Sequence, residues 1–216
     1  MYELDRMALD AIHAEHLQAV EYARKHYKEL AKRKHTYTLY GGDTYCIGVQ
    51  IPSRFIHKSG RKLLKSTRRE KYAAYELDEN YHVLRTVHML EHGNRIDCTY
   101  HHFELNGFHY AYPFRGNTGD EYTGEIAVLK HNQEGKPTYF ALVSKYLLAI
   151  EFYTYSSADS MLVSTYHYHV TAEKSYYGFP IDPNAPINAE NSNIVHFCNE
   201  QKPHFVDFSQ YFKQQE

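Results

Sequence analysis

The sequence predicts a mainly β protein of the α+β class, in which an antiparallel meander of about eight to nine strands carries one long helix. Two patterns in the chain lead to this prediction. From Tyr72 to Val170, segments of seven to eleven residues rich in aromatic and β-branched side chains are separated by short turn sequences. Near the N-terminus, residues 3–34 instead repeat their apolar side chains every three or four positions, as an amphipathic helix does.

The composition is that of a globular chain that fills one domain. Of the 216 residues, 43% are hydrophobic and 23% are charged, so the chain can bury a core and is not disordered. We therefore expect a single domain over residues 1–216. It consists of the helix at 3–34, the sheet at 43–170, and an extended tail at 171–216 that adds a short edge strand or helix.

The N-terminal helix is predicted from one continuous apolar stripe and from the charges at its end. The stripe runs through Leu9, Ile12, His16, Val20, Ala23, Tyr27 and Leu30. Three basic residues at 32–34 close the helix, which suits the negative end of the helix dipole. We expect the stripe to pack on the sheet, with a homodimer formed through the helix as the alternative, and His16 to be a packed core residue.

The meander is predicted from its turns and from alternating strands. Asn106-Gly107 is the strongest hairpin signal in the chain. Many strands are apolar on both faces, so the sheet must be covered on both sides, which favours a barrel-like or strongly curved sheet hugged by the helix. We place a first strand at Tyr45–Ile51 and the meander strands at Tyr72–Asp78, Tyr81–Glu91, Arg95–Glu104, Phe108–Phe114, Glu121–Lys130, Thr138–Ser144, Tyr146–Tyr155 and Met161–Val170.

The C-terminal part of the chain has a different character from the meander. Three prolines and several asparagines lie between Tyr176 and Asn193, which indicates an extended and irregular segment. After it, Ile194–Cys198 fits a short edge strand and Pro203–Phe212 fits a short helix.

Net charge and cysteine content indicate which partners and which cellular compartment to expect. The formal net charge of −2 provides no overall field that attracts nucleic acid or an anionic membrane. The three cysteines fit neither a disulfide framework nor a metal knuckle, which indicates a reducing compartment. No apolar run approaches the roughly 20 residues of a membrane span, and the acidic N-terminus is not a signal peptide. We expect a cytoplasmic protein that binds neither nucleic acid nor membrane.

A basic segment between Lys58 and Lys71 is the first candidate binding feature. Ser59-Gly60 reads as the turn of a hairpin, and seven cations around it face a single acidic residue, Glu70. Such a hairpin is either a solvated loop or a contact for an acidic partner surface or an anion. The residues that we expect to contact a partner are Arg61, Lys62, Lys65, Arg68 and Arg69.

The sequence His167-Tyr168-His169 is the second candidate. On a strand, residues two apart point to the same side, so His167 and His169 could chelate one zinc or iron ion. With 16 histidines in the chain, two histidines that only form hydrogen bonds are the more ordinary interpretation, and we expect no bound cofactor.

Binding is the function that these patterns favour, and no residue is assigned a catalytic role. The chain has no G-x-S-x-G elbow and no phosphate-binding glycine loop. Its 22 tyrosines suit an interface or a pocket, and we expect Tyr110, Tyr112, Tyr166 and Tyr168 to contact the ligand or partner.

Three functions remain open after this reading. The first is a non-catalytic protein that recognises and inhibits a protein partner; immunity proteins of bacterial toxin systems have a similar featureless profile. The second is a barrel-like protein that binds a small aromatic or anionic ligand. The third is a histidine-dependent enzyme that uses His167 and His169, with or without a metal.

Overall fold

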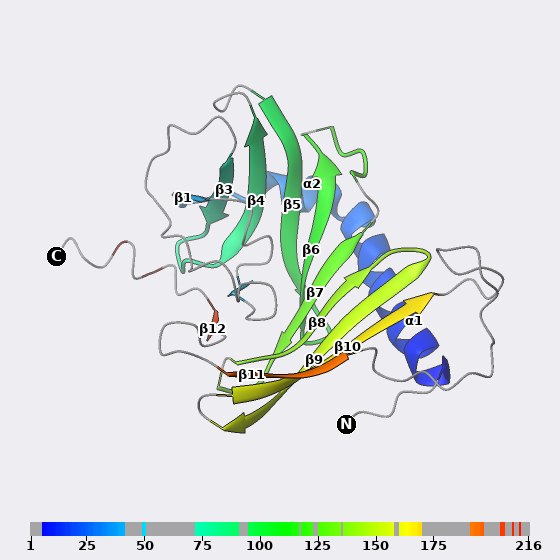
Figure 1. Cartoon of the computed structure of the whole chain (residues 1–216). Coiled ribbons are helices and arrows are strands. Elements are labelled where there is room, and N and C mark those ends of the chain that lie inside the picture. The colour runs from blue at the N-terminus through cyan, green and yellow to red at the C-terminus, as the bar shows by residue number, and fades with distance from the viewer. Residues whose placement is uncertain are drawn as a thin grey trace.

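The computed structural model describes residues 6–41, 49–50, 72–90, 95–116, 118–122, 125–134, 136–157, 160–169, 191–196, 204–205, 209 and 212. Within these residues the chain forms one large antiparallel sheet with helices on one of its faces (Figure 1). The sheet is curled but does not close into a barrel. The fold class predicted from the sequence is therefore confirmed.

The sheet has ten described strands, and each pairs with its neighbour antiparallel, in the order β1-β3-β4-β5-β6-β7-β8-β9-β10-β11. Its strands are β1 (Tyr37–Gly41), β3 (Tyr72–Leu77), β4 (Val83–Leu90), β5 (Arg95–Leu105), β6 (Phe108–Arg115), β7 (Ile126–His131), β8 (Pro137–Val143), β9 (Leu147–Ser157), β10 (Ser160–His169) and β11 (Asn191–His196). Strands β3 to β10 are the eight strands of the predicted meander. They follow one another in space as they do in sequence, because each turn is too short for anything but a hairpin.

Three predicted elements outside the meander need correction or adjustment. The first strand of the sheet is β1, not Tyr45–Ile51; of that segment only β2 (Val49–Gln50) is described, and it pairs with β12 (His204–Phe205) in a separate two-stranded sheet. The helix predicted over Pro203–Phe212 is wrong at residues 204–205, since these form β12. The predicted edge strand is confirmed as β11, which begins three residues earlier than expected.

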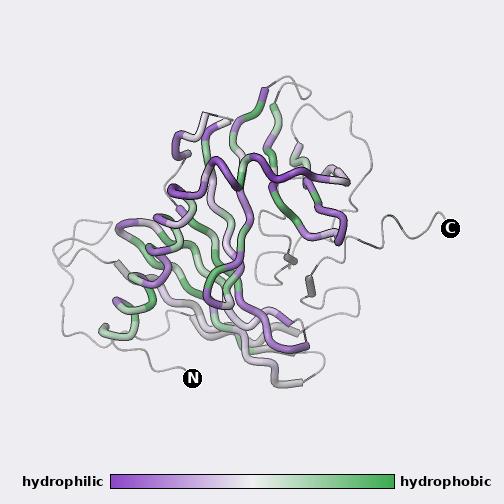
Figure 2. Tube along the Cα trace, turned by 180° about the vertical axis from the view of Figure 1, so that it is seen from behind, coloured by the Kyte–Doolittle hydropathy of each residue, from purple (hydrophilic) through white to green (hydrophobic). Residues whose placement is uncertain are grey.

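The predicted helix is present but consists of two pieces, α1 (Arg6–Lys25) and α2 (Tyr27–Lys32). The backbone at His26, with φ −101° and ψ 11°, departs from helical geometry and separates them. The stripe of α1 packs on the sheet at β6, β7 and β8, and Leu9, Ala19 and Ala23 are fully buried there. Figure 2 shows apolar and polar residues alternating along this helix, as expected for one that covers a core on one side only.

Both faces of the sheet are buried along much of its length, as the two-sided apolar pattern predicts. In β6, every residue from 110 to 114 is buried. The helix-side core contains Tyr110, Phe114 and Val128 together with the stripe of α1. On the opposite face, Leu39, Tyr75 and Leu77 form a second cluster, against which Phe212 near the C-terminus packs. The face of the sheet that the helices cover extends beyond α2 over β1, β3 and β4, and the candidate site lies there.

Candidate functional site

A pocket of about 590 Å³ lies on the helix-side face of the sheet, beside α2 and over strands β1, β3, β4 and β5. The main sheet contacts of helix α1 are instead with β6, β7 and β8. The described residues that line the pocket are Tyr27, Ala31, His35, Thr38, Tyr40, Tyr72, Ala74, Glu76, Arg85, Val87, Met89, Ile96, Thr99 and His101. Three are tyrosines and two are histidines, so the pocket is lined by the residue types in which the chain is rich.

Strand register explains why these side chains meet. Directly paired residues of an antiparallel sheet share a face, and Thr38, Glu76, Arg85 and His101 are paired in succession across four strands. The neighbouring row on the same face consists of Tyr40, Ala74, Val87 and Thr99. The first row lies toward α2 and is polar, and the second row is mainly apolar. The pocket therefore has a polar end and an apolar end.

The polar end is organised by Arg85. Its Nε donates to Glu76 Oε2 at 2.5 Å, and its Nη1 donates to the carbonyl of Ala31 at 2.6 Å, in the last turn of α2. The Nδ1 atom of His35 lies 3.3 Å from Arg85 Nη2 and 3.4 Å from Glu76 Oε2. The side chains of Arg85 and Glu76 are only 13% and 19% exposed, so this ion pair is shielded from bulk water.

Arg33 attaches α2, which forms the roof of the pocket, to the sheet. It follows α2 directly and donates from Nη2 to the carbonyls of Leu84 at 2.9 Å and His102 at 2.6 Å, on β4 and β5. Burial, and then the charge of nearby Arg85, lowers the pKa of Arg33. Two arginines thus attach a six-residue helix to the sheet through backbone carbonyls. A helix of this length would not be stable alone, so its position depends on these contacts.

His101 forms the inner wall of the pocket. Its ring is 3% exposed and lies edge-on to Tyr27 and Phe114, with ring centroids 5.5 Å and 5.4 Å away. Burial, and then the charges of Arg85 and Arg33, lowers the pKa of His101 to about 4, so the ring is neutral at pH 7. Among the described residues its buried Nδ1 has no hydrogen-bond partner of good geometry, and an unpaired buried polar atom costs roughly 1–3 kcal/mol. The backbone of Leu30 acts against burial and raises the pKa, but by less than burial lowers it.

The ring of Tyr27 packs against His101 from α2. Its ring also packs on Phe114, at a centroid distance of 4.5 Å, and against the backbone of Gly119. Gly119 has φ +83°, and a Cβ there would lie 2.7 Å from Cε1 of Tyr27, so only glycine fits. The loop after β6 therefore clamps one wall of the pocket.

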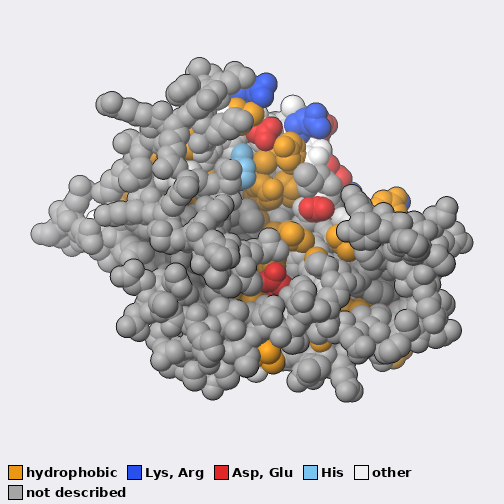
Figure 3. Space-filling model, in the orientation of Figure 1, with side chains coloured by type: hydrophobic (Ala, Val, Ile, Leu, Met, Phe, Trp, Pro, Cys, Tyr) orange, Lys and Arg blue, Asp and Glu red, His pale blue; other side chains and the backbone are white. Residues whose placement is uncertain are grey.

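A second polar cluster lies on the opposite face of the sheet. Figure 3 views the molecule from this face, on which hydrophobic side chains gather near β5 and β6. His102 Nε2 is 2.9 Å from Thr86 Oγ1, and its Nδ1 is 3.0 Å from His109 Nε2. His101 and His102 therefore point to opposite faces, as neighbouring residues of a strand do. Burial lowers the pKa of His102 and that of His109, the latter to about 4, so this cluster is an uncharged chain of hydrogen bonds.

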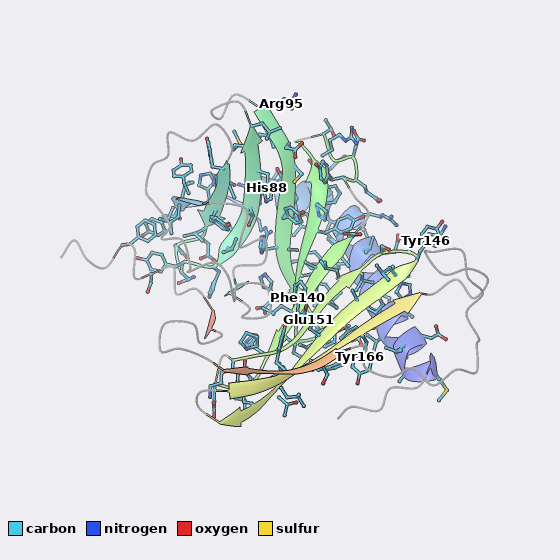
Figure 4. The ribbon with its side chains drawn as sticks, in the orientation of Figure 1. His88, Arg95, Phe140, Tyr146, Glu151 and Tyr166 are labelled. Carbon is cyan, nitrogen blue, oxygen red and sulfur yellow. The ribbon has the colours of Figure 1, made fainter. Side chains whose placement is uncertain are left out.

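The predicted tyrosines divide between the core and the part of the chain whose side chains are not described. Tyr110, Tyr112 and Tyr166 are at most 1% exposed and lie in the helix-side core, not in the pocket wall. Figure 4 labels Tyr166 on β10, with Phe140 and Glu151 side by side on β8 and β9. The side chain of Tyr168 lies outside the described part of the structure.

The two other candidate sites fall mostly on residues that the structure does not describe. All five basic residues from Arg61 to Arg69 lie in the segment 51–71, outside the described ranges. The backbone pairs His167 with Ala149 and His169 with Leu147, while both histidine side chains lie outside the described part. Among the side chains that are described, no group of three or more His, Cys, Asp or Glu residues is placed to hold a metal ion.

Sequence reasoning did not find the pocket residues Glu76, Arg85 and His35. A signal existed, because Arg85 interrupts the apolar side of its strand, where a charge is rarely placed unless it is paired. What the sequence could not supply was the partner: Glu76 is nine residues away, and only the register of β3 and β4 brings it opposite Arg85.

No described helix is long and apolar enough to cross a membrane. No family model matches the chain, and no match is found among the curated proteins or among the solved structures. The function therefore has to be argued from the pocket itself.

Proposed function

We propose that this protein binds a small organic molecule in the pocket between α2 and strands β1, β3, β4 and β5. The observation that supports this function is the pocket, whose volume of about 590 Å³ falls within the range of known ligand sites. Its walls also have the usual composition of such sites, with aromatic and aliphatic side chains around a few polar groups. This is the second of the three functions that the sequence left open.

The pocket is suited to binding because its walls are fixed before a ligand arrives. The roof is attached to the sheet by Arg33 and Arg85, and Tyr27 is clamped over Gly119. A preformed site does not have to order its side chains on binding, which otherwise costs about 0.5–1.5 kcal/mol for each one. A modest apolar contact area is then sufficient for measurable affinity.

Filling the pocket tests this function. Ala74 is 8% exposed and lines the apolar end, so the larger side chain of an Ala74→Phe variant occupies the space of the ligand. We expect the variant to bind 2-naphthol, a neutral fluorescent aromatic probe, at least tenfold more weakly than the wild type. Fluorescence titration measures this, and Ala74→Ser, which leaves the volume almost unchanged, is the matched control.

A wild-type protein that fails to bind 2-naphthol, or an Ala74→Phe variant that binds it as tightly as the control, would contradict this function. Circular dichroism of both variants verifies that the sheet is retained. Recognition of a protein partner through Arg61, Lys62, Lys65, Arg68 and Arg69 remains a prediction from the sequence, because those residues lie outside the described part of the chain. The same holds for an enzyme that uses His167 and His169.

A further inference from the structure

We infer that the pocket selects neutral, planar aromatic molecules that carry a hydrogen-bond donor and acceptor side by side, as carboxamides, lactams and nucleobase-like heterocycles do. This inference rests on the proposed ligand-binding function and specifies the ligand class. It comes from the unused hydrogen-bonding capacity of the Arg85–Glu76 pair, from the balance of charge in the pocket wall, and from the aromatic rings at the opposite end.

The Arg85–Glu76 pair offers both a donor and an acceptor to the pocket. A guanidinium has five N–H donors. Those of Arg85 serve Glu76, Ala31 and His35 once each, so within the described part of the chain two N–H groups are left over. Glu76 accepts the Arg85 hydrogen bond through Oε2, and its Oε1 makes no hydrogen bond to a described residue. An amide edge, which presents C=O beside N–H, matches this combination. The carbonyl accepts from the spare guanidinium N–H, and the amide N–H donates to Oε1.

The charges in the pocket wall disfavour ions of either sign. Arg85 and Glu76 are the charged residues among the described lining side chains, and they cancel. An anionic ligand is attracted to Arg85 and repelled by Glu76, and a cation experiences the reverse. Either ion must also lose its hydration, which is costly in a shielded site. A neutral polar group loses less hydration and still makes both hydrogen bonds, so it binds best.

The apolar end accounts for the planar aromatic part of the ligand. Ala74, Val87 and Met89 form its floor, while Tyr40 and Tyr72 stand at its border with ring centroids 5.5 Å apart and nearly perpendicular. This arrangement gives a flat ligand both an aliphatic surface to lie on and aromatic edges to contact. A ring bearing an amide therefore reaches the polar end and the apolar end at the same time.

Three probes of the same shape but different charge test this inference. They are 2-naphthamide, 2-naphthoate and 2-naphthamidine, which share the naphthalene ring and carry a neutral, an anionic and a cationic head. We expect the wild-type protein to bind the amide at least fivefold more tightly than either ion, as measured by isothermal titration calorimetry at pH 7. Displacement of 2-naphthol by each probe reports binding at the same pocket.

A Glu76→Gln variant provides a readout that a purely structural role would not produce. The substitution preserves size and leaves Arg85 as an uncompensated cation, so we expect the preference to shift at least tenfold from 2-naphthamide toward 2-naphthoate. Glu104→Gln is the matched control, because Glu104 is exposed on β5 and does not line the pocket, and its order of affinities should equal that of the wild type.

The outcomes separate the two proposals. If the wild-type protein does not bind 2-naphthol, ligand binding at this pocket is refuted, and this inference with it. If the naphthalene probes bind but an ion binds as tightly as the amide, the pocket function stands and the inferred ligand class is wrong. An unchanged order of affinities in the Glu76→Gln variant would also overturn the role given to the ion pair.

Discussion

Buried histidines in this protein serve as uncharged polar core residues. His16 on α1 is fully buried, and its Nδ1 lies 3.1 Å from the hydroxyl of Tyr110 and its Nε2 2.7 Å from that of Tyr139. A neutral imidazole accepts at one nitrogen and donates at the other, so it satisfies both hydroxyl groups. Burial, and to a smaller degree His13, lowers the pKa of His16 to about 4. Binding a proton at this position would therefore disrupt the helix–sheet contact.

The depressed pKa of His16 predicts how stability depends on pH. Between pH 6.5 and 4 the unfolded chain protonates this histidine and the folded protein does not, so stability falls as the pH is lowered through that window. The contribution is fully present above pH 6.5. A His16→Leu variant lacks it, so from pH 6 to 4.5 the wild type should lose about 1.4 kcal/mol per pH unit more than the variant. Urea unfolding at several pH values measures both slopes.

The comparison of slopes isolates His16 from other buried histidines. His101 and His109 have their pKa values lowered to about 4 as well, but they titrate equally in both proteins and cancel in the difference. At pH 7 the variant is expected to be less stable, because the hydroxyl groups of Tyr110 and Tyr139 lose their partner. Parallel stability curves for the two proteins would show that His16 is protonated in the folded state.

Among the elements, α2 depends most on side chains from elsewhere. Of its six residues only Leu30 is buried, and Tyr27 adds the contacts of its ring with His101 and Phe114. Arg33 and Arg85 connect its last turn to β4 and β5 through carbonyl groups. Hydrogen bonds from a charged donor contribute more than neutral ones, about 1.5–3 kcal/mol each. The roof of the pocket is thus held by polar contacts.

Removing Arg33 should therefore be more harmful than removing an exposed arginine of α1. We expect Arg33→Met to lower the free energy of unfolding by about 2–4 kcal/mol, because the carbonyls of Leu84 and His102 lose their donor inside the protein. Arg24 pairs with Glu21 and Glu121 but is 43% exposed, so Arg24→Met should cost about 0–1 kcal/mol. Denaturant unfolding of both variants measures the difference. Equal losses would mean that the Arg33 contacts contribute no more than a surface ion pair.

At the scale of helices and strands, most elements can be predicted from the sequence, but those that depend on long-range pairing cannot. The meander and the helical stripe are visible because alternation and the three-to-four spacing are local properties. Strand β1 is missed because Tyr37–Gly41 follows the helix directly and ends at a glycine pair, and only its pairing with β3 stabilises it as a strand. The pocket is missed for the same reason, since Glu76, Arg85 and His101 become neighbours only through register.

At the scale of the whole molecule, the open sheet is covered at its β1 end by a residue from the other end of the sequence. Its described edges are β1 and β11, and Phe212 near the C-terminus packs on the β1 end. The ring of Phe212 lies 4.6 Å from that of Tyr37 and 5.5 Å from that of Tyr81, and the three form one aromatic stack. A residue far along the chain from β1 thus supports this strand, which also borders the pocket.

This stack predicts that Phe212 supports the β1 end of the sheet. Phe212→Ala should lower the free energy of unfolding by about 1–3 kcal/mol, since an aromatic side chain that is partly buried is removed. At roughly 2–4 °C per kcal/mol for a chain of this size, the melting temperature should fall by several degrees. Tyr146→Ala removes a ring that is 56% exposed and serves as the control, with a change near zero. Equal melting temperatures for the two variants would contradict the stack.

The sequential order of the strands also determines how the chain assembles during synthesis. Since β4 to β10 each pair with the preceding strand, hairpins can close one after another as they leave the ribosome. Helix α1 is made before these strands, and the strands against which it packs are complete only after Val143. Nascent chains that stop before Phe108 therefore expose Leu9 and Val20 to water without a sheet to cover them, and such fragments are expected to aggregate or to require a chaperone.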